Sequence, residues 1–109
     1  MSAEHCIISK QGNQVLVRGA ENQVQHIEGN WYFHPDCIDK NKFIISERTY
    51  QCPHKGVCNW VDLKIGNTYL NNVSWVYPRT REKYHHIAGW YGFYDNHTKY
   101  RHTECGKEK

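Results

Sequence analysis

The sequence predicts a mainly β, single small domain, built as a curved antiparallel sheet or a barrel-like arrangement with one or two short helical turns. Two observations carry this prediction: short runs rich in aromatic and β-branched residues recur along the chain, and Gly, Asn and Pro separate them at intervals typical of all-β domains. At 109 residues, with no repeat or linker, the chain is long enough to bury one core. We therefore expect one domain over residues 1–109, with a core over about 6–95 and a polar, flexible tail over 103–109.

The expected strands follow these runs, and three Gly-Asn pairs supply turns between some of them. The pairs lie at 12–13, 29–30 and 66–67 and favour hairpins, because Gly and Asn adopt positive φ at low cost. The expected strands cover residues 6–9, 14–18, 23–28, 30–33, 50–52, 59–65, 72–76 and 88–94.

Two segments predict the short helical turns. The segment "HPDCIDKNKF" can form one turn with Pro35 at its first helical position, where a missing N–H is tolerated. The segment "TREKYHH" can form another. Neither is long enough to change the fold class.

Period-two alternation assigns side chains to faces of three expected strands. The resulting sets place several aromatic rings where they could meet across a curved sheet. The expected sets are Val61, Leu63 and Ile65 opposite Trp60, Asp62 and Lys64; Val73, Trp75 and Tyr77 on one face; and Trp90, Gly92 and Tyr94 opposite Tyr91 and Phe93.

Charge and hydropathy argue against two classes of partner. Fourteen basic and eleven acidic residues give a net charge of +3 without a dense run, so we expect no nucleic-acid partner. The chain has no apolar stretch of about 18 residues, so we expect no membrane partner. The start "MSAEHCIISKQG" lacks the apolar region of a secretory signal, and we expect a cytoplasmic protein, either a monomer or a homodimer.

Five cysteines are an odd count, and a disulfide framework does not persist in a reducing compartment. We therefore expect reduced thiols. For the same reason the glycosylation patterns that begin at Asn72 and Asn96 are expected to carry no sugar.

The segment "QCPHKGVC" (51–58) combines two thiols, a histidine and a lysine. The spacing of Cys52 and Cys58 is wider than that of a zinc knuckle, and no second knuckle follows, so we expect no metal and no cofactor. Cys52 is a candidate nucleophile, because a positive charge on Lys55 or His54 would lower a thiol pKa. The simpler interpretation is a strand that ends at Cys52, with Gly56 carrying the chain around a turn.

Two further groups of residues have a chemical and a structural interpretation. Asp36 and Asp39, three residues apart, could form a carboxylate pair for acid–base chemistry, but an acid in a first helical turn also complements the helix dipole. The aromatic residues on the strands could stack a planar ligand or cage a cation, or could simply form the core. They include Trp31, Trp60, Trp75 and Trp90, with Tyr32, Tyr77, Tyr91 and Tyr94.

Four blocks of the chain, "WYFHPDCI", "TYQCPHKGVCNWVDL", "NVSWVYP" and "IAGWYGFY", resemble in order and spacing the family grouped as domain of unknown function 427. The resemblance covers about residues 12–94 and implies a compact, mainly β domain. Typical members read like E-G-N-x-Y-F-P-P-D, T-x-C-P-[YW]-K-G-T-A, A-A-W-x-Y-P and I-x-G-Y-V-A-F-Y. This chain departs from the pattern at His34, His54 and the Val57-Cys58 pair. The matching positions are Tyr32, Phe33, Pro35, Asp36, Cys52, Pro53, Lys55, Gly56, Trp75, Tyr77, Pro78, Gly89, Phe93 and Tyr94.

The family is sometimes filed as nucleotidyltransferase-like. Nucleotidyl transfer needs a carboxylate pair for Mg²⁺ and a cradle for phosphates. The sequence has neither a Gly-Ser loop followed by Asp-x-Asp nor a phosphate-binding glycine loop before a helix, so its residues do not support this heading.

Three hypotheses about function follow. The first is a pocket that binds a small polar or planar ligand, with Lys55 supplying charge, Tyr32, Trp75 and Tyr77 as walls, Asp36 as a polar contact and Cys52 as a lining thiol. The second is an enzyme that uses a reactive Cys52 thiolate assisted by Lys55 or His54. The third is a protein-interaction module without a catalytic role. Whether the protein is an enzyme stays open at this point.

Overall fold

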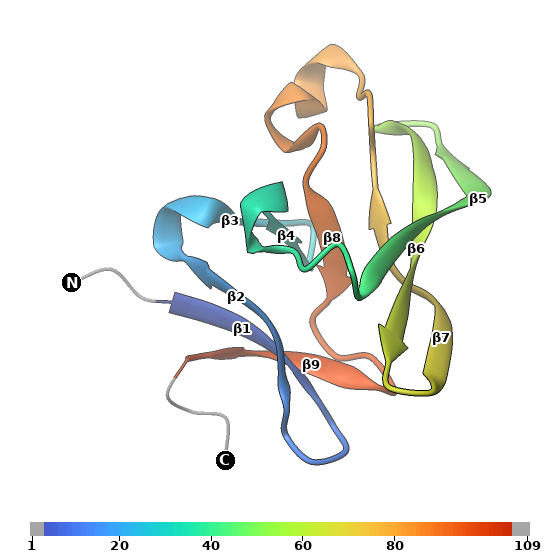
Figure 1. Ribbon diagram of the computed structural model, residues 1–109. Helices are drawn as coiled ribbons and strands as arrows, with labels where there is room; N and C mark the ends of the chain where they lie inside the picture. Colours follow the sequence, from blue (N-terminus) through green and yellow to red (C-terminus); the bar gives the residue numbers. More distant parts are fainter. Residues whose placement is uncertain (1–3, 106–109) are drawn as a thin grey trace.

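Two antiparallel β-sheets make up the protein, as a computed structural model of residues 4–105 shows. One sheet has three strands in the order β2-β1-β9, and the other has six in the order β3-β4-β8-β7-β6-β5. In Figure 1, β1, β2 and β9 lie in the lower part of the molecule and β5, β6 and β7 to the right. Neither sheet closes into a barrel. The predicted mainly β fold class is confirmed. Of the two predicted arrangements, the structure has open antiparallel sheets rather than a barrel.

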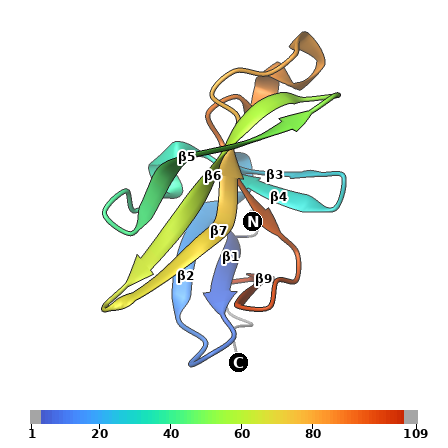
Figure 2. The same ribbon diagram turned by 90° about the vertical axis from the view of Figure 1, so that its right-hand side faces the viewer.

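Along the described residues, a short 3-10 helix follows every second or third strand. Figure 2 shows the long, twisted strands β6 and β7, which pair along most of their length. The elements are β1 (Glu4–Ser9), β2 (Val15–Ala20), η1 (Glu21–Gln23), β3 (Val24–Ile27), β4 (Asn30–Phe33), η2 (Pro35–Cys37), β5 (Phe43–Cys52), β6 (Gly56–Ile65), β7 (Thr68–Val76), η3 (Glu82–Ile87), β8 (Tyr91–Tyr94) and β9 (Tyr100–Glu104).

Each expected strand overlaps an observed one, but several boundaries differ, among them that of β6, which begins at Gly56 rather than at residue 59. Strand β5 begins at Phe43, seven residues before residue 50, the predicted start. It is an edge strand with a mostly exposed surface and an irregular register between Ile45 and Thr49, so the alternation that marks a strand is broken there. Strand β7 begins at Thr68 rather than at residue 72, and β8 begins at Tyr91 rather than at residue 88.

Strand β9 was not predicted at all, because its residues were assigned partly to a flexible tail. Its sequence, "YRHTE", is polar apart from Tyr100, and it pairs with β1 from His5↔Glu104 to Ser9↔Tyr100. The expectation of a flexible tail is therefore wrong for residues 103 and 104. The rest of the expected tail, from 106 on, lies outside the described residues.

The two expected helical turns are confirmed as η2 and η3, and η1 is an additional one. Pro35 begins η2, as the sequence predicts. Residue 23, expected to begin a strand, instead ends η1, where the Gln23 side chain accepts a hydrogen bond from the backbone N–H of Ala20 at 3.0 Å.

The main core lies between the sheets, because its members come from both. Phe33, Phe43 and Tyr100 each pack edge-to-face on Phe93 with ring centroids 5.7 Å apart. A second cluster draws only on the six-stranded sheet and η3, and lies on that sheet's outer face. Its buried members are Tyr32, Cys58, Trp75, Tyr77, Tyr84 and Ile87.

The predicted faces agree with these clusters except at one place. Val61, Leu63 and Ile65 belong to the main core, as do Tyr91 and Phe93. The prediction that Val73 shares a face with Trp75 and Tyr77 is wrong: Val73 packs in the main core and the other two in the second cluster. The reason is a bulge between β6 and β7, where Asn72 adopts a φ of +58° and interrupts the alternation.

The expectation of reduced thiols is wrong for one pair. Cys6 in β1 and Cys105 just after β9 form a disulfide with their Cα atoms 5.5 Å apart, although 99 residues separate them in sequence. The pairing of β1 with β9, which the sequence analysis missed, brings the two thiols together. Cys37, Cys52 and Cys58 are free. Over residues 4–105, no helix is long and apolar enough to cross a membrane.

Candidate functional site: an aromatic pocket on the six-stranded sheet

A pocket of about 290 Å³ lies on the outer face of the six-stranded sheet, above the second cluster. We call it the aromatic pocket, because six of its nine lining residues are Trp or Tyr. Strands β4, β5, β6, β7 and β8 all contribute to it, so it depends on the assembled sheet rather than on one loop. The lining residues are Asn30, Tyr32, Tyr50, Lys55, Cys58, Trp60, Trp75, Tyr77 and Tyr94.

Trp75 is at the centre of this lining. It lies opposite Gly92 in the β7–β8 pair, and a Cβ on Gly92 would come within 2.4 Å of the indole ring. The ring therefore occupies the space that any other residue at position 92 would fill. Trp60, its cross-strand neighbour on β6, packs edge-on at 6.2 Å, and Tyr94 is tilted at 4.8 Å.

Two tyrosines of the pocket, Tyr32 and Tyr77, are hydrogen-bonded phenols rather than anions. Trp75 Nε1 donates to the Tyr32 hydroxyl at 3.3 Å. Burial raises the pKa of Tyr32 and, much more strongly, the pKa of Tyr77. Both phenols stay protonated near neutral pH and can donate or accept hydrogen bonds.

Lys55 reaches the pocket from the turn between β5 and β6. Pro53 lies in the same turn, and β6 begins at Gly56. Gly56 has a φ of +119°, and a Cβ there would approach the carbonyl oxygen of Arg79 to 3.3 Å. The Lys55 carbonyl accepts a hydrogen bond from the backbone N–H of Arg81 at 3.0 Å, which fixes the turn against the segment before η3. The interpretation of this segment as a strand end and tight turn is confirmed.

The ammonium of Lys55 faces the carboxylate of Glu28, with which it forms an ion pair. Glu28 lies in the two-residue Glu28-Gly29 turn between β3 and β4, where both residues have positive φ. The Tyr84 hydroxyl of η3 donates to the second carboxylate oxygen at 2.9 Å, and Lys55 Nζ lies 4.8 Å from the Tyr84 ring centroid. Segments that are far apart in sequence thus meet at one buried lysine, which is 8% exposed.

Both members of this pair are charged. Burial alone would lower the pKa of Lys55, but the hydrogen bond to Glu28 raises this pKa above its usual value. Hydrogen bonds from Lys55 and Tyr84 lower the pKa of the Glu28 carboxyl. The lysine that lines the pocket therefore has its positive charge compensated by Glu28.

The two free thiols of "QCPHKGVC" have different environments. Burial alone would raise the pKa of Cys52, but hydrogen bonds from the backbone N–H groups of Lys55 and His54, with the Lys55 charge, lower it below its usual value. Burial raises the pKa of Cys58, which lines the pocket. Cys52 itself does not line the pocket. It is half-buried against the second cluster and hydrogen-bonded to Tyr77, which does line it.

Asp36 lies apart from the other predicted site residues. Its side chain is 80% exposed on η2, with Oδ2 3.6 Å from His34 Nδ1. Its backbone N–H donates to the same nitrogen at 3.0 Å, and Asp39 accepts from the backbone N–H of Asn41 at 3.0 Å. Both acids thus have local roles in turns. The structure brings together Tyr32, Lys55, Trp75 and Tyr77, with Cys52 adjacent, but it does not bring Asp36 to them.

Sequence reasoning missed Glu28 and Tyr84, and assigned no role to Asn30, Tyr50 or Cys58 in the pocket. A signal for two of them was present, since Glu28-Gly29-Asn30 matches the E-G-N of the family pattern. Nothing in the local sequence indicates that Tyr84 of η3 reaches Glu28.

No group of three or more His, Cys, Asp or Glu side chains that could hold a metal ion occurs within residues 4–105. His54, the residue that made "QCPHKGVC" resemble a metal clip, is exposed in the turn. The absence of a metal and of a cofactor stays a prediction.

These observations define a class: a mainly β domain of two open antiparallel sheets, whose larger sheet carries an aromatic pocket lined by a lysine that is ion-paired with Glu28. The family described as Domain of unknown function (DUF427) matches residues 11–104. The chain therefore belongs to this family, and the resemblance inferred from the four blocks is confirmed. A comparison with curated proteins found no match.

Proposed function

We propose that the protein binds a small planar ligand that carries polar groups, and that the aromatic pocket is its binding site. One observation carries the proposal: a cavity of about 290 Å³ combines indole and phenol walls with a buried lysine whose partner carboxylate is hydrogen-bonded on both oxygens. Ligand sites commonly pair mostly apolar walls with a few fixed polar groups, and the smaller ones have volumes of about 300 Å³. The volume fits a ligand of one or two rings.

The walls favour a planar ligand. Trp60 is half-buried and Tyr94 exposed, and each meets the buried Trp75 ring in an edge-on or tilted pair, so both can offer ring surface to a stacked ligand. Their positions are fixed by the sheet register and by Gly92, so little side-chain entropy would be lost on binding.

Polar groups on the ligand would be read by the wall that contains Lys55. The Lys55 ammonium has three N–H donors, of which Glu28 engages one, and the Asn30 side chain of the lining offers both a donor and an acceptor. A flat ring with adjacent donor and acceptor atoms, such as an amide-containing heterocycle, matches this arrangement.

The test is a binding screen with soluble planar heterocycles, followed by affinity measurements on two matched variants. Tyr50 and Tyr69 are both strand tyrosines, 53% and 52% exposed, but only Tyr50 lines the aromatic pocket. We expect Tyr50→Ala to weaken binding by about tenfold, the value of one lost stacking contact of about 1–1.5 kcal/mol, and Tyr69→Ala to leave it unchanged. Absence of any binding heterocycle, or equal affinities in a folded Lys55→Ala variant and the wild type, would contradict the proposal.

A second candidate function is an enzyme that uses the Cys52 thiolate, and the lowered pKa of Cys52 favours it. Titration with iodoacetamide tests it through the pH dependence of alkylation. Cys52 should be alkylated at a pH well below the usual cysteine pKa of about 8.5, and Cys58, whose pKa is raised, should not. Equal, slow labelling of Cys37, Cys52 and Cys58 would exclude a reactive thiolate.

The cytoplasmic location and the monomeric or homodimeric state are part of the same proposal. The absence of a nucleic-acid partner also stays a prediction from the low net charge. The Cys6–Cys105 disulfide is the observation that weighs against a reducing compartment, because such bonds persist mainly where the environment is oxidising. Thiol labelling of the protein in intact cells distinguishes a reducing from an oxidising compartment, since Cys6 and Cys105 would be labelled only if they were reduced.

A further inference from the structure

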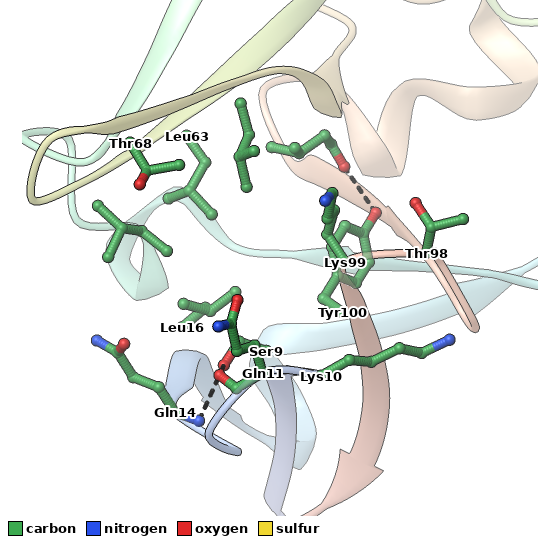
Figure 3. Close-up of a pocket in the computed structure, with 13 residues that line it drawn as sticks. Ser9, Lys10, Gln11, Gln14, Leu16, Leu63, Thr68, Thr98, Lys99 and Tyr100 are labelled. Carbon is green, nitrogen blue, oxygen red and sulfur yellow. Dashed lines mark hydrogen bonds between the residues drawn. The ribbon is translucent and has the colours of Figure 1, made fainter.

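A second cavity, of about 510 Å³, lies between the two sheets, away from the aromatic pocket. We call it the inter-sheet cavity. Figure 3 shows Leu63 and Thr68 on one side of it and Leu16 and Gln14 on the other. The first two come from β6 and β7, and the others from β2 and the turn before it. No lining residue is shared by the two cavities.

The floor of the inter-sheet cavity is apolar and continuous with the main core. Its polar atoms already have partners within the protein. The Tyr100 hydroxyl donates to the carbonyl of Val73 at 2.6 Å, and Ser9 Oγ donates to the carbonyl of Gln11 and accepts from the N–H of Gln14. The floor therefore offers dispersion contacts and few free hydrogen-bonding groups, which suits a hydrocarbon. It is formed by Leu16, Leu63, Ile65, Leu70, Val73 and Tyr100.

The rim of the cavity is positively charged. Lys10 follows β1, and Lys99 precedes Tyr100 of β9; the backbone N–H of Lys10 donates to the Lys99 carbonyl at 3.0 Å, which holds the backbones of the two lysines together at the rim. Within residues 4–105, the lining contains no Asp or Glu, and no ion pair involves either lysine. Burial and the charges of Lys10 and Lys99 lower the pKa of neighbouring His97, as expected if this positive potential is uncompensated.

We propose that the inter-sheet cavity binds one molecule of an anionic amphiphile, a straight-chain carboxylate whose hydrocarbon part lies on the apolar floor and whose head group lies between Lys10 and Lys99. The two halves of the ligand match the two halves of the site. A hydrocarbon chain needs the apolar floor, and a carboxylate needs the positive charge of the two lysines. This proposal is independent of the aromatic pocket, and either site can be present without the other.

The test is a calorimetric titration with hexanoate, octanoate and decanoate below their micelle concentrations, with octan-1-ol and octyltrimethylammonium as comparison compounds. Each added methylene that enters the cavity should tighten binding by about fourfold. Octanoate should bind more tightly than octan-1-ol, and octyltrimethylammonium should not bind measurably, because the lysines repel it.

Two charge-matched variants localise the head group. The Lys10→Glu/Lys99→Glu double variant should weaken octanoate binding by about tenfold or more, since it removes two attractive contacts and adds repulsion. The Lys40→Glu/Lys83→Glu double variant changes net charge equally at exposed positions outside the lining, and should bind octanoate like the wild type. Leu16→Trp, which fills the cavity, should remove binding in a folded protein.

Amide chemical shifts give the location independently of affinity. Octanoate should shift the amide signals of Gln14, Leu16, Thr68 and Tyr100 and leave the indole signals of Trp60 and Trp75 unchanged. The proposal is overturned if octanoate does not bind saturably, if octan-1-ol binds as tightly, if both double variants behave alike, or if the shifts map to the aromatic pocket.

Discussion

Lys55 lines the aromatic pocket, and its surroundings set the charge that the proposed ligand would meet there. Its ammonium is held by Glu28 from the β3–β4 turn, and Tyr84 of η3 donates to the same carboxylate. The sequence placed a lysine, a thiol and a glycine in one turn, but it could not indicate which carboxylate lies opposite, because that contact is set by the sheet and not by local spacing. Lys55 and Glu28 therefore balance each other's charge, whereas the sequence alone suggested an unbalanced positive charge at Lys55.

The Lys55–Glu28 pair predicts a pH dependence of stability. The pKa of Glu28 is lowered from its usual value near 4.5, so its contribution is present above that pH and is lost as pH falls through the folded-state pKa. The pKa of Lys55 is raised above 10.5, so its contribution is present below that pH and is lost as pH rises through the folded-state pKa. The contribution of the pair should be constant between the two limits.

Urea denaturation of the wild type and Glu28→Gln at pH 3 and pH 7 checks this prediction. The substitution should destabilise the protein at pH 7, because Lys55 stays buried without its partner, and less at pH 3, because this pH lies below the usual carboxyl pKa and part of the contribution of Glu28 is then lost. An equal loss at both pH values would show that the carboxylate charge contributes nothing.

Gly92 is a second single residue on which the pocket depends. A Cβ at this position would overlap the Trp75 ring, so Gly92→Ala should destabilise the protein by about 1–3 kcal/mol and change the Trp fluorescence spectrum. In a Trp75→Leu background the same substitution should cost less, because the ring that it displaces is gone. Additive effects in this double-mutant cycle would contradict the close packing of Gly92 and Trp75.

Among the elements, strands with clear apolar alternation could be predicted, and elements that depend on distant partners could not. Strand β4 was predicted with its observed bounds, because its aromatic residues and the preceding turn are visible locally. Strand β9 is polar and becomes a strand because β1 offers it a complete set of backbone partners. The bulge at Asn72 likewise depends on the β6–β7 register, so Val73 was assigned to the wrong face.

The disulfide that joins β1 to the end of β9 should be a main source of stability. It closes nearly the whole chain into one loop, which restricts the unfolded state, and its loss should cost about 2–5 kcal/mol. Cys105→Ser should lower the midpoint of urea denaturation accordingly, and reduction of the wild type should do the same. Cys37→Ser is the control, because Cys37 is free. If oxidised and reduced wild type unfold at the same urea concentration, the disulfide does not stabilise the fold.

At the scale of the whole molecule, the two sheets are also joined by a stack of rings. Trp31 of β4 lies between His26 and His102, with centroids 3.9 and 3.6 Å away, and His102 Nε2 is 2.9 Å from His5 Nδ1. Burial, followed by the charge of His5, lowers the pKa of His102 to about 4. No histidine in this stack was singled out from the sequence, because His26 and His102 are 76 positions apart.

Acidification should therefore weaken the contact between the sheets. Since the pKa of His102 falls from 6.5 in the unfolded chain to about 4 in the folded protein, the unfolded state binds more protons between these values, and stability should decrease as pH falls from 6.5 to 4. His102→Phe, which keeps a ring but cannot titrate, should flatten this part of the profile in thermal denaturation. An unchanged slope would assign the effect to other groups.

The two sheets give the molecule two separate cavities, one on the outer face of the larger sheet and one between the sheets. Tyr32, Lys55, Trp75 and Tyr77, which the sequence grouped into one expected site, all line the first cavity, and its role as a ligand site stays a prediction. Nothing in the sequence indicated the second cavity, because the floor residues are ordinary core types that the sheet packing leaves partly uncovered.

The central claim is that the aromatic pocket binds a planar ligand. The most direct measurement is the indole Nε1–H region of the NMR spectrum during titration with amide-containing heterocycles. We predict saturable shifts of the Trp60 and Trp75 signals, with the Trp31 signal unchanged because this ring stacks between two histidines elsewhere in the molecule. The absence of saturable shifts at Trp60 and Trp75 for every heterocycle, or equal shifts of all the indole signals, would contradict the claim.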